Sequence, residues 1–451
     1  MTSQLNIIIL AAGKGTRMKS NTLKVLHPLA GSTIIEHVLS TSQQLSPDKI
    51  IMVYGHQGEQ LKTHLHKQNL TWVEQSNPQG TGHAVQLAMP HVDKGAKILV
   101  LVGDAPLIDS EDLKKLLNHS QAVLTAKMSN PYGYGRIIKN NQGLVEAIIE
   151  QKDASQSQQL INEINSGIIL AMADDLDHWL KQINNNNAQG ELYLTDVLAL
   201  AHADDKSFNS VTVQDNSSIK GINDRVQLAE CEAIKQSQLR NELMLRGVYL
   251  ANPATTQIRG SIECGQDISV DTGVIFEGHN TIEDEVSIGA YSIIKNCQLG
   301  KGTRIAPHSM LENVITDGDC DIGPYARLRP GTIIGQKAKV GNFVETKKTT
   351  IGVNSKASHL TYLGDCEIGD NVNIGAGTIT CNYDGVNKFK TIIEDDVFIG
   401  SDSQLIAPVT VGKGATIGAG TTLSKDAESG KLTLARARQK TIEGWKKPTK
   451  L

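Results

Sequence analysis

A glycine-rich stretch near the start of the chain combines a flexible backbone with positive charge. Residues 13–18 (GKGTRM) follow the apolar run of residues 7–12 (IIILAA), which is typical of a strand buried on both faces. Such a turn lets backbone N–H groups approach a phosphate closely, and its lysine and arginine add charge. The pattern is neither GxGxxG nor a Walker A motif, because no Lys-Ser/Thr pair follows the second glycine. The stretch favours an anionic ligand over a plain tight turn.

Asp104 and a second loop lie farther along the chain and suit the same kind of ligand. Asp104 comes directly after Gly103, at the end of the apolar run of residues 96–102 (AKILVLV). A carboxylate there suits a magnesium ion, although it could instead cap the helix that follows Pro106. Residues 77–83 (NPQGTGH) offer backbone and hydroxyl donors to a base or a phosphate.

The second half of the chain holds another set of residues that could do chemistry. Arg329 and Lys347 could bind a phosphate, or they could form a solvated cationic face. His359 could take a proton from an attacking amine, because histidine is a common general base, whereas a lone histidine is more often structural. Residues 380–390 (TCNYDGVNKFK) read as a loop that interrupts a regular repeat, and such loops on rigid scaffolds often carry function.

Alternating strands and helices must position the first set of residues. Residues 49–53, 72–75 and 96–102 read as strands, and residues 191–203 and 225–246 read as helices. Such alternation predicts an α/β domain with a doubly wound, Rossmann-like sheet. Ligands of such sheets bind beyond the carboxyl ends of the strands, where the strand order reverses.

A six-residue repeat must position the second set. It runs from near Ile258 to near Thr422, and an aliphatic residue opens each unit. A helix needs apolar residues three and four positions apart, which this run does not supply. A fixed six-residue period predicts a parallel β-helix, and a glycine-rich antiparallel domain would not keep one phase for so long. The predicted domains are residues 1–225 and 248–451, and residues 226–247 form a linking helix. The clearest repeats open at Ile393, Ile399, Leu405, Val411 and Ile417.

Composition excludes several classes of protein. The chain of 451 residues has a formal net charge of −4 and no long basic run, which argues against binding to nucleic acid or to a membrane surface. The six cysteines form no CxxC pair and no zinc spacing, so we expect free thiols in a reducing compartment. The apolar run of residues 7–12 is too short to span a membrane. A cytoplasmic enzyme is the expectation.

Several of these stretches together resemble a known family. Residues 10–18 (LAAGKGTRM) with Lys24, residues 80–84 (GTGHA), Gly103-Asp104 and residues 221–223 (GIN) look like a sugar-phosphate nucleotidyltransferase. With the solenoid, nearly the whole chain resembles the bacterial bifunctional N-acetylglucosamine-1-phosphate uridyltransferases and glucosamine-1-phosphate acetyltransferases. Two departures concern the shape of the pocket: residues 21–23 (NTL) lack the family's usual proline, and Val102 stands where tyrosine is common.

The resemblance implies that the β-helix is left-handed, that the chain is a homotrimer and that the product is UDP-N-acetylglucosamine, a precursor of peptidoglycan and lipopolysaccharide. It implies UTP and Mg²⁺ at the first site, with Asp104 and Asn223 holding the metal and Lys24 and Arg17 stabilising the triphosphate. The remaining residues implied to bind UTP or the sugar nucleotide are Leu10, Ala11, Ala12, Gly13, Gln75, Gly80, Thr81, Val102, Gly103, Gly135, Glu150 and Asn165.

At the second site the resemblance implies that His359 is the general base for transfer from acetyl-CoA to an amino sugar. Glu345 is expected to orient either the imidazole or the substrate's ammonium group. The amine attacks the thioester directly, so Cys381 has no catalytic role. The residues implied to bind the sugar phosphate are Arg329, Lys347, Tyr362 and Asn373, and those implied to bind acetyl-CoA are Ala376, Asn382, Tyr383, Ser401, Ala419 and Arg436.

Two other readings use the same folds. The β-helix could be purely regulatory, as in ADP-glucose pyrophosphorylases, but such a module would not need His359 beside Arg329 and Lys347. A non-enzymatic regulator, as among translation-initiation exchange factor subunits, could dispense with Lys24 and Asp104. Because these residues are all present, the bifunctional enzyme is preferred.

Overall fold

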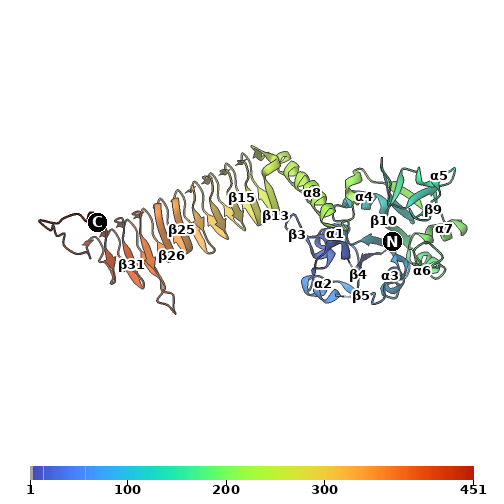
Figure 1. Cartoon of the computed structure of the whole chain (residues 1–451), viewed down its shortest axis with the longest axis horizontal. Helices are drawn as coiled ribbons and strands as arrows, with labels where there is room; N and C mark the ends of the chain where they lie inside the picture. Colours follow the sequence, from blue (N-terminus) through green and yellow to red (C-terminus); the bar gives the residue numbers. More distant parts are fainter. Residues whose placement is uncertain (1–3, 14, 56, 451) are drawn as a thin grey trace. The chain divides into compact units, whose positions relative to one another are not determined.

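The computed structural model describes residues 4–13, 15–55 and 57–450, so Lys14 of the glycine-rich turn lies outside the described residues. The chain forms two compact units, Met1–Lys235 and Gln236–Leu451 (Figure 1). Within the described ranges no helix is long and apolar enough to cross a membrane.

The first unit is built on a mixed sheet with the strand order β11-β7-β10-β6-β1-β4-β5. Strand β1 lies between β4 and β6 and is parallel to both, so the order reverses beside β1. The strands are β1 (Leu5–Ala11), β2 (Pro28–Leu29), β3 (Ser32–Thr33), β4 (Lys49–Tyr54), β5 (Thr71–Glu74), β6 (Lys97–Val102), β7 (Ala122–Lys127), β8 (Arg136–Lys139), β9 (Val145–Ile149), β10 (Glu163–Met172) and β11 (Asn209–Thr212).

Helices cover both faces of this sheet. Ile7 and Ile9 of β1 pack in one buried cluster with α1 and α4, whereas Ile8 packs in another with α3, α6 and α7. This arrangement confirms the predicted doubly wound fold. The helices are α1 (Ile34–Gln43), α2 (Gly58–His64), α3 (Thr81–Ala88), α4 (Ser110–Leu117), α5 (Gln156–Gln159), α6 (Ala173–Leu180), α7 (Asp196–Ala203) and α8 (Arg225–Leu245), with 3₁₀ turns η1 (Thr16–Met18), η2 (Lys24–Leu26), η3 (Met89–His91) and η4 (Asn216–Ile219).

One predicted helix begins later than expected. Residues 191–203 were predicted to be helical, but α7 begins only at Asp196. The preceding residues bond instead to the loop before α3: Leu192 exchanges backbone hydrogen bonds with Gln79 and Gly82. These tertiary bonds replace the intrahelical bonds that the local pattern favours.

The second unit is a parallel β-helix, as the six-residue repeat predicts. Each coil returns in register, so that Ile322 pairs with Val340, Val340 with Ala357, and Ile399 with Ile417. These aliphatic side chains point inward and are buried, which makes one continuous core along the stack of strands (Figure 1). The left hand of the coil stays a prediction.

The strands of the β-helix have two or three residues except for four longer ones, β13, β15, β25 and β26. They are β12 (Tyr249–Leu250), β13 (Gln257–Cys264), β14 (Ser269–Val270), β15 (Ile275–Ile282), β16 (Ser287–Ile288), β17 (Ile293–Lys295), β18 (Gln298–Leu299), β19 (Arg304–Ile305), β20 (Met310–Glu312), β21 (Val314–Thr316), β22 (Asp321–Ile322), β23 (Arg327–Leu328), β24 (Thr332–Ile334), β25 (Lys339–Ile351), β26 (Lys356–Ile368), β27 (Asn373–Ile374), β28 (Ile379–Cys381), β29 (Thr391–Ile393), β30 (Phe398–Ile399), β31 (Gln404–Ile406), β32 (Val409–Val411), β33 (Thr416–Ile417), β34 (Thr422–Leu423) and β35 (Leu432–Thr433), with the 3₁₀ turn η5 (Pro253–Thr255) after β12.

The two units divide inside α8, because each half of the helix packs on a different core. Cys231, with Leu228 and Ile234 packed around it, belongs to a buried cluster of the first unit. Leu243 is buried in the core of the β-helix, and Leu239 packs against that core. The compact units therefore meet at residues 235 and 236, whereas the sequence suggested a separate linking segment of residues 226–247.

One corner of the β-helix carries an exposed column of rings, which we call the ring column: Tyr291, His308, Tyr325 and Phe343. Neighbouring rings are nearly parallel, with centroids 5.4, 4.9 and 5.5 Å apart. All four residues, and Leu360 on the next coil, have positive φ, which is unfavourable for bulky side chains. Positive φ recurs at many other non-glycine residues of this unit, so what sets the ring column apart is its exposed, stacked rings.

Candidate active sites

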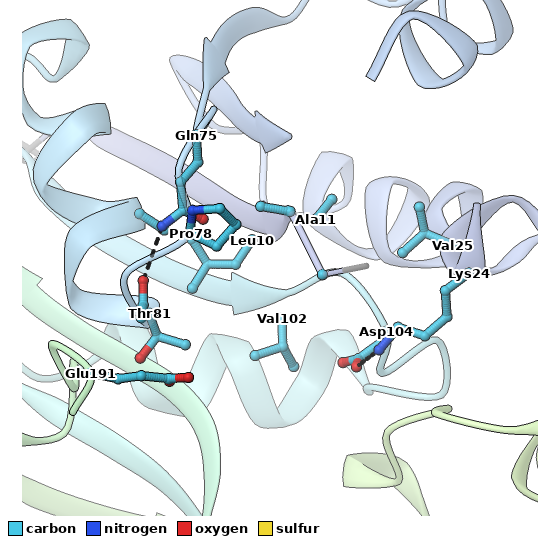
Figure 2. Close-up of a pocket in the computed structure, with 14 residues that line it drawn as sticks. Leu10, Ala11, Lys24, Val25, Gln75, Pro78, Thr81, Val102, Asp104 and Glu191 are labelled. Carbon is cyan, nitrogen blue, oxygen red and sulfur yellow. Dashed lines mark hydrogen bonds and ion pairs between the residues drawn. The ribbon is translucent and has the colours of Figure 1, made fainter. Parts of the chain in front are cut away.

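The carboxyl ends of β1 and β6 open into a pocket of about 280 Å³ (Figure 2). It lies where the strand order reverses, as expected for a doubly wound sheet. Gly103 lets the two strand ends approach, since a Cβ there would lie 2.9 Å from the Leu10 carbonyl oxygen. Of the predicted nucleotide-binding residues, those lining the pocket are Leu10, Ala11, Ala12, Gly13, Lys24, Gln75, Gly80, Thr81, Val102 and Asp104.

Two oxygens from distant segments converge on the Lys24 ammonium at one end of this pocket. Lys24 Nζ lies 2.6 Å from Asp104 Oδ2, a contact that Figure 2 shows. The same nitrogen lies 3.2 Å from Asn223 Oδ1. Asp104 does not cap the following helix, because Asp109 is the N-cap of α4. Convergence of a carboxylate and an amide oxygen on one cation fits Mg²⁺, which binds one or two protein oxygens along with phosphates and water. Within the described residues no group of three or more His, Cys, Asp or Glu gathers to hold an ion.

Gln75 lies at the other end of the pocket, and its side-chain amide is held by its neighbours. Gln75 Nε2 donates to the Gly80 carbonyl oxygen at 3.1 Å and lies 3.2 Å from His83 Nδ1. Gly80 has a φ of 117°, and a Cβ there would lie 2.4 Å from the Leu192 carbonyl oxygen. Only glycine fits this position, so the loop that holds Gln75 depends on it.

The predicted sugar-binding residues form a group beside the pocket. Asn165 N donates to the Gly135 carbonyl oxygen at 2.9 Å, and a Cβ on Gly135 would lie 3.3 Å from Glu150 Oε1. Burial raises the pKa of Glu150 above its usual value, and Asp153 and Asp196 add to the rise, whereas a hydrogen bond from Thr195 opposes it. Polar groups gathered in this way suit the hydroxyl groups of a sugar.

Other residues at the first site differ from the expectation. Arg17 is exposed on η1 and does not line the pocket, so within the described residues only Lys24 brings a positive side chain to its wall. Glu191 lines the pocket near Thr81 (Figure 2), and the sequence pattern missed it because the segment was read as helix. Val25, Pro78 and Ala84 also line it, and small apolar residues of this kind carry no sequence signal for a ligand.

At the second site, His359 is exposed on β26, and its partner is Asn342 rather than Glu345. His359 Nδ1 lies 2.7 Å from Asn342 Oδ1. The prediction that Glu345 orients the imidazole is wrong, since its carboxylate accepts from Arg329 Nη1 at 2.8 Å. The cause is the register, which pairs Asn342 with His359 and Glu345 with Tyr362. Its alternative role, toward the ammonium group of the substrate, stays a prediction.

Arg329 and Lys347 lie together, and Lys388 from the loop of residues 380–390 joins them. The Lys388 side chain contacts Lys347 and lowers the pKa of Lys347 below that of an ordinary lysine; Arg329 lowers it further, whereas Asp365 opposes the effect. A lysine whose pKa is lowered by positive neighbours favours an anionic ligand. Lys388 was not predicted, because only folding of the loop brings it to Lys347.

Residues with small side chains occupy the coil position of His359 on the next three coils. The registers place Ala376, Ser401 and Ala419 in one column with His359. With coils about 4.8 Å apart, the column extends about 14 Å from the imidazole. At its far end Arg436 Nη1 donates to the Ala419 carbonyl oxygen at 2.6 Å. The column therefore forms a surface strip of small side chains that begins at His359 and ends at the Arg436 guanidinium.

The remaining predicted residues lie around this column and the cationic cluster. Tyr362 lies over Gly364, where a Cβ would be 2.4 Å from its hydroxyl oxygen. Asn382 is buried and donates to Asp365 Oδ2 at 2.5 Å, so it anchors the base of the loop. Tyr383 and Asn373 are exposed, the first on the loop and the second on β27. Asn373 lies three residues before Ala376, on the face that leads to the column.

Comparison with known proteins agrees with this division. Residues 7–162 match the MobA-like NTP transferase domain, residues 258–362 the GMPPB C-terminal domain, and residues 390–425 the bacterial transferase hexapeptide (six repeats). A solved UDP-glucose pyrophosphorylase complexed with UDP-glucose aligns with 52% of this chain and 99% of its own, at 16% identity and a TM-score of 0.43.

Two curated relatives match over the whole length, and each carries the name Bifunctional protein GlmU. The one from Janthinobacterium sp. (strain Marseille) is 49% identical over 451 residues, and the one from Herminiimonas arsenicoxydans is 50% identical over 451 residues. Each alignment covers 99% of this chain and 100% of the relative. With identity of this order at full length, and both domain types matched in order, the chain belongs to the GlmU family of bifunctional N-acetylglucosamine-1-phosphate uridyltransferases and glucosamine-1-phosphate acetyltransferases.

Proposed function

We propose that the pocket at β1 and β6 performs the uridyl transfer and that the His359 column performs the acetyl transfer. The observation that carries the first assignment is the convergence of Asp104 and Asn223 on the Lys24 ammonium. The acetyl assignment is supported by the imidazole that Asn342 orients beside the strip of small side chains.

In the uridyl transfer, a phosphate oxygen of N-acetylglucosamine-1-phosphate attacks the α-phosphorus of UTP, and pyrophosphate leaves. The nucleophile is already ionised, so the protein positions it and neutralises charge rather than removing a proton. Lys24 supplies that charge, while Gln75 and Thr81 hold the base end and Glu150 and Asn165 hold the sugar. Asp104 and Asn223 would hold Mg²⁺, which neutralises the triphosphate when bound.

In the acetyl transfer, the amine of glucosamine-1-phosphate attacks the thioester carbonyl of acetyl-CoA. Because Asn342 Oδ1 accepts a hydrogen bond, the proton of a neutral imidazole lies on His359 Nδ1, and Nε2 is free to take the proton of the amine. The same proton is then available to the departing coenzyme A thiolate. The phosphate lies toward Arg329 and Lys347, and acetyl-CoA lies along the Ala376–Ala419 column.

Omission of single components tests both assignments at once. The purified full-length chain is incubated with glucosamine-1-phosphate, acetyl-CoA, UTP and Mg²⁺, and UDP-N-acetylglucosamine is measured by chromatography. Omission of acetyl-CoA should stop the acetyl transfer. Omission of UTP or Mg²⁺ should stop only the uridyl transfer, so that N-acetylglucosamine-1-phosphate accumulates. Acetylation that continues without acetyl-CoA, or uridyl transfer that continues without Mg²⁺, would contradict the proposal. The cytoplasm, which holds UTP and acetyl-CoA and keeps the six free thiols reduced, is the proposed location.

A homotrimer in contact through the ring column is the proposed assembly. The column ends beside the acetyl site, because Phe343 follows Asn342 and Leu360 follows His359. A partner packed on these rings would therefore shield His359 from water.

The Phe343→Asp variant should be a monomer at concentrations where the unsubstituted chain is a trimer. Asp adopts positive φ more readily than Phe, so the variant should fold. Light scattering measures the mass, and Tyr249→Asp, at an exposed ring outside the column, is the control. If the Phe343→Asp variant is still a trimer, the ring column is not part of the interface.

Lys388→Ala should raise the KM for glucosamine-1-phosphate about tenfold, the effect of losing one charged hydrogen bond to a phosphate. Initial acetylation rates at varied sugar phosphate measure it. The control is Lys390→Ala, because Lys390 lies on the same loop but pairs with Glu367. Equal effects of the two substitutions would show that the loop contributes only general positive charge.

Arg436→Ala should raise the KM for acetyl-CoA about fivefold, since the guanidinium at the end of the column would bind a phosphate of coenzyme A. Deletion after Ser424 should have a larger effect or abolish acetyl transfer, and uridyl transfer should not change. Arg438→Ala, an exposed arginine two residues away, serves as the control. An unchanged KM in a deletion variant that is still trimeric would contradict a role for the tail.

A further inference from the structure

The orientation of the Gln75 amide at the base end of the pocket is decided by two acceptors. The Gly80 carbonyl oxygen can only accept, so the Gln75 atom 3.1 Å away must be the nitrogen. His83 Nδ1 lies 3.2 Å from the same nitrogen and accepts its second hydrogen when the ring proton is on Nε2. Both N–H groups of the amide are then used.

The first of these acceptors has little freedom to move. The backbone on both sides of Gly80 is bonded to the segment before α7: Leu192 N donates to the Gln79 carbonyl oxygen at 2.7 Å, and Gly82 N donates to the Leu192 carbonyl oxygen at 2.8 Å. Leu194 N donates to Thr81 Oγ1 at 3.1 Å. Gln75 itself is 3% exposed, so water does not compete for its amide.

An amide held in this way offers a ligand only its oxygen, and that distinguishes the pyrimidine bases. Uracil carries a hydrogen on N3, which Gln75 Oε1 can accept. In cytosine the N3 atom has a lone pair and no hydrogen, so two acceptors, N3 and Gln75 Oε1, would face each other. A freely turning amide could bring its N–H to cytosine instead. A site built around a substrate N–H rejects analogues that lack it when the partner group is left unpaired.

We propose that His83 is a specificity-determining positioning residue, which holds the Gln75 amide so that the pocket takes uracil and rejects cytosine. This inference rests on the proposed function, in which Gln75 contacts the base of UTP. His83 acts through Gln75 and does not itself contact the nucleotide. Because thymine has the same N3–H as uracil, the device does not separate these two bases.

The test compares UTP, CTP and dTTP as substrates of the full-length chain and of its His83→Leu variant. We expect the ratio of kcat/KM for UTP to that for CTP to fall about tenfold. The variant lacks the hydrogen bond from Gln75 to His83, which keeps the amide from turning its N–H toward the base. The ratio for UTP to dTTP should not change, which distinguishes loss of amide orientation from general damage to the pocket. Acetyl transfer by the same sample shows that the second unit is intact, and a retained rate with UTP shows that the first unit is folded.

Two further variants make the result decisive. His83→Gln keeps a side-chain acceptor and should retain more of the discrimination than His83→Leu. His91→Leu, at an exposed histidine outside the pocket at β1 and β6, should behave as the unsubstituted chain. An unchanged ratio of kcat/KM for UTP to that for CTP in His83→Leu would overturn the inference about His83 and leave the proposed function standing. Absence of uridyl transfer from UTP in the unsubstituted chain would overturn the proposed function, and the inference with it.

Discussion

Asp104→Asn is expected to reduce uridyl transfer about 10²- to 10³-fold, the usual cost of removing one group that stabilises charge in a transition state. The substitution keeps the shape of the side chain but removes the carboxylate that meets Lys24 Nζ at 2.6 Å. The two side chains proposed to hold Mg²⁺ would then both be neutral amides, which bind the ion more weakly than a carboxylate does. The Mg²⁺ concentration that gives half-maximal rate should therefore rise as well.

Acetyl transfer by the same sample controls for the amount of intact chain, because it depends on the other unit. Circular dichroism of the variant checks the fold of the substituted unit. A matched substitution is Asp109→Asn, at the N-cap of α4, where Asn caps a helix as well as Asp does. Release of pyrophosphate at varied Mg²⁺ gives both quantities. Equal loss of the two activities in Asp104→Asn would point to misfolding, and full uridyl activity would remove Asp104 from the metal site.

His359→Ala is expected to reduce acetyl transfer at least about 10²-fold, which is the usual scale for loss of a general base. Uridyl transfer should be unchanged, so the two substitutions should affect opposite activities. Only the free amine can attack once the base is gone, so the residual rate should rise with pH as the substrate loses its ammonium proton. Formation of free coenzyme A thiol measures the rate.

The partner of the imidazole gives a graded check on this assignment. Asn342→Ala should lower acetyl transfer about tenfold, because the imidazole remains but loses the hydrogen bond that orients it. His279→Ala, at an exposed histidine elsewhere on the β-helix, should have no effect. If His359→Ala retained full acetyl transfer, the base would have to be sought elsewhere.

Repeats and strand ends in the sequence indicated the architecture and the place of the first site, and the family resemblance supplied most of its residues. A six-residue period permits only a coil in which every sixth side chain enters one core, so Ile322, Val340 and Ile399 are buried as the pattern predicts. The carboxyl ends of β1 and β6 had to meet because parallel strands share one edge. That edge places Asp104 beside the glycine-rich turn, and most of the predicted nucleotide residues line one pocket there.

Tertiary structure alone decided the partners of the reacting groups. Asn342 meets His359 because one coil of this β-helix takes 17 residues at that point, a length that no local pattern gives. Lys388 reaches Lys347 only because its loop folds back on the coil. His83 lies one helical turn into α3, yet its contact with Gln75 depends on where β5 ends. At each of these places the contact joins residues that are distant in sequence, so local sequence preferences cannot predict it. These contacts decide which partner orients each reacting side chain.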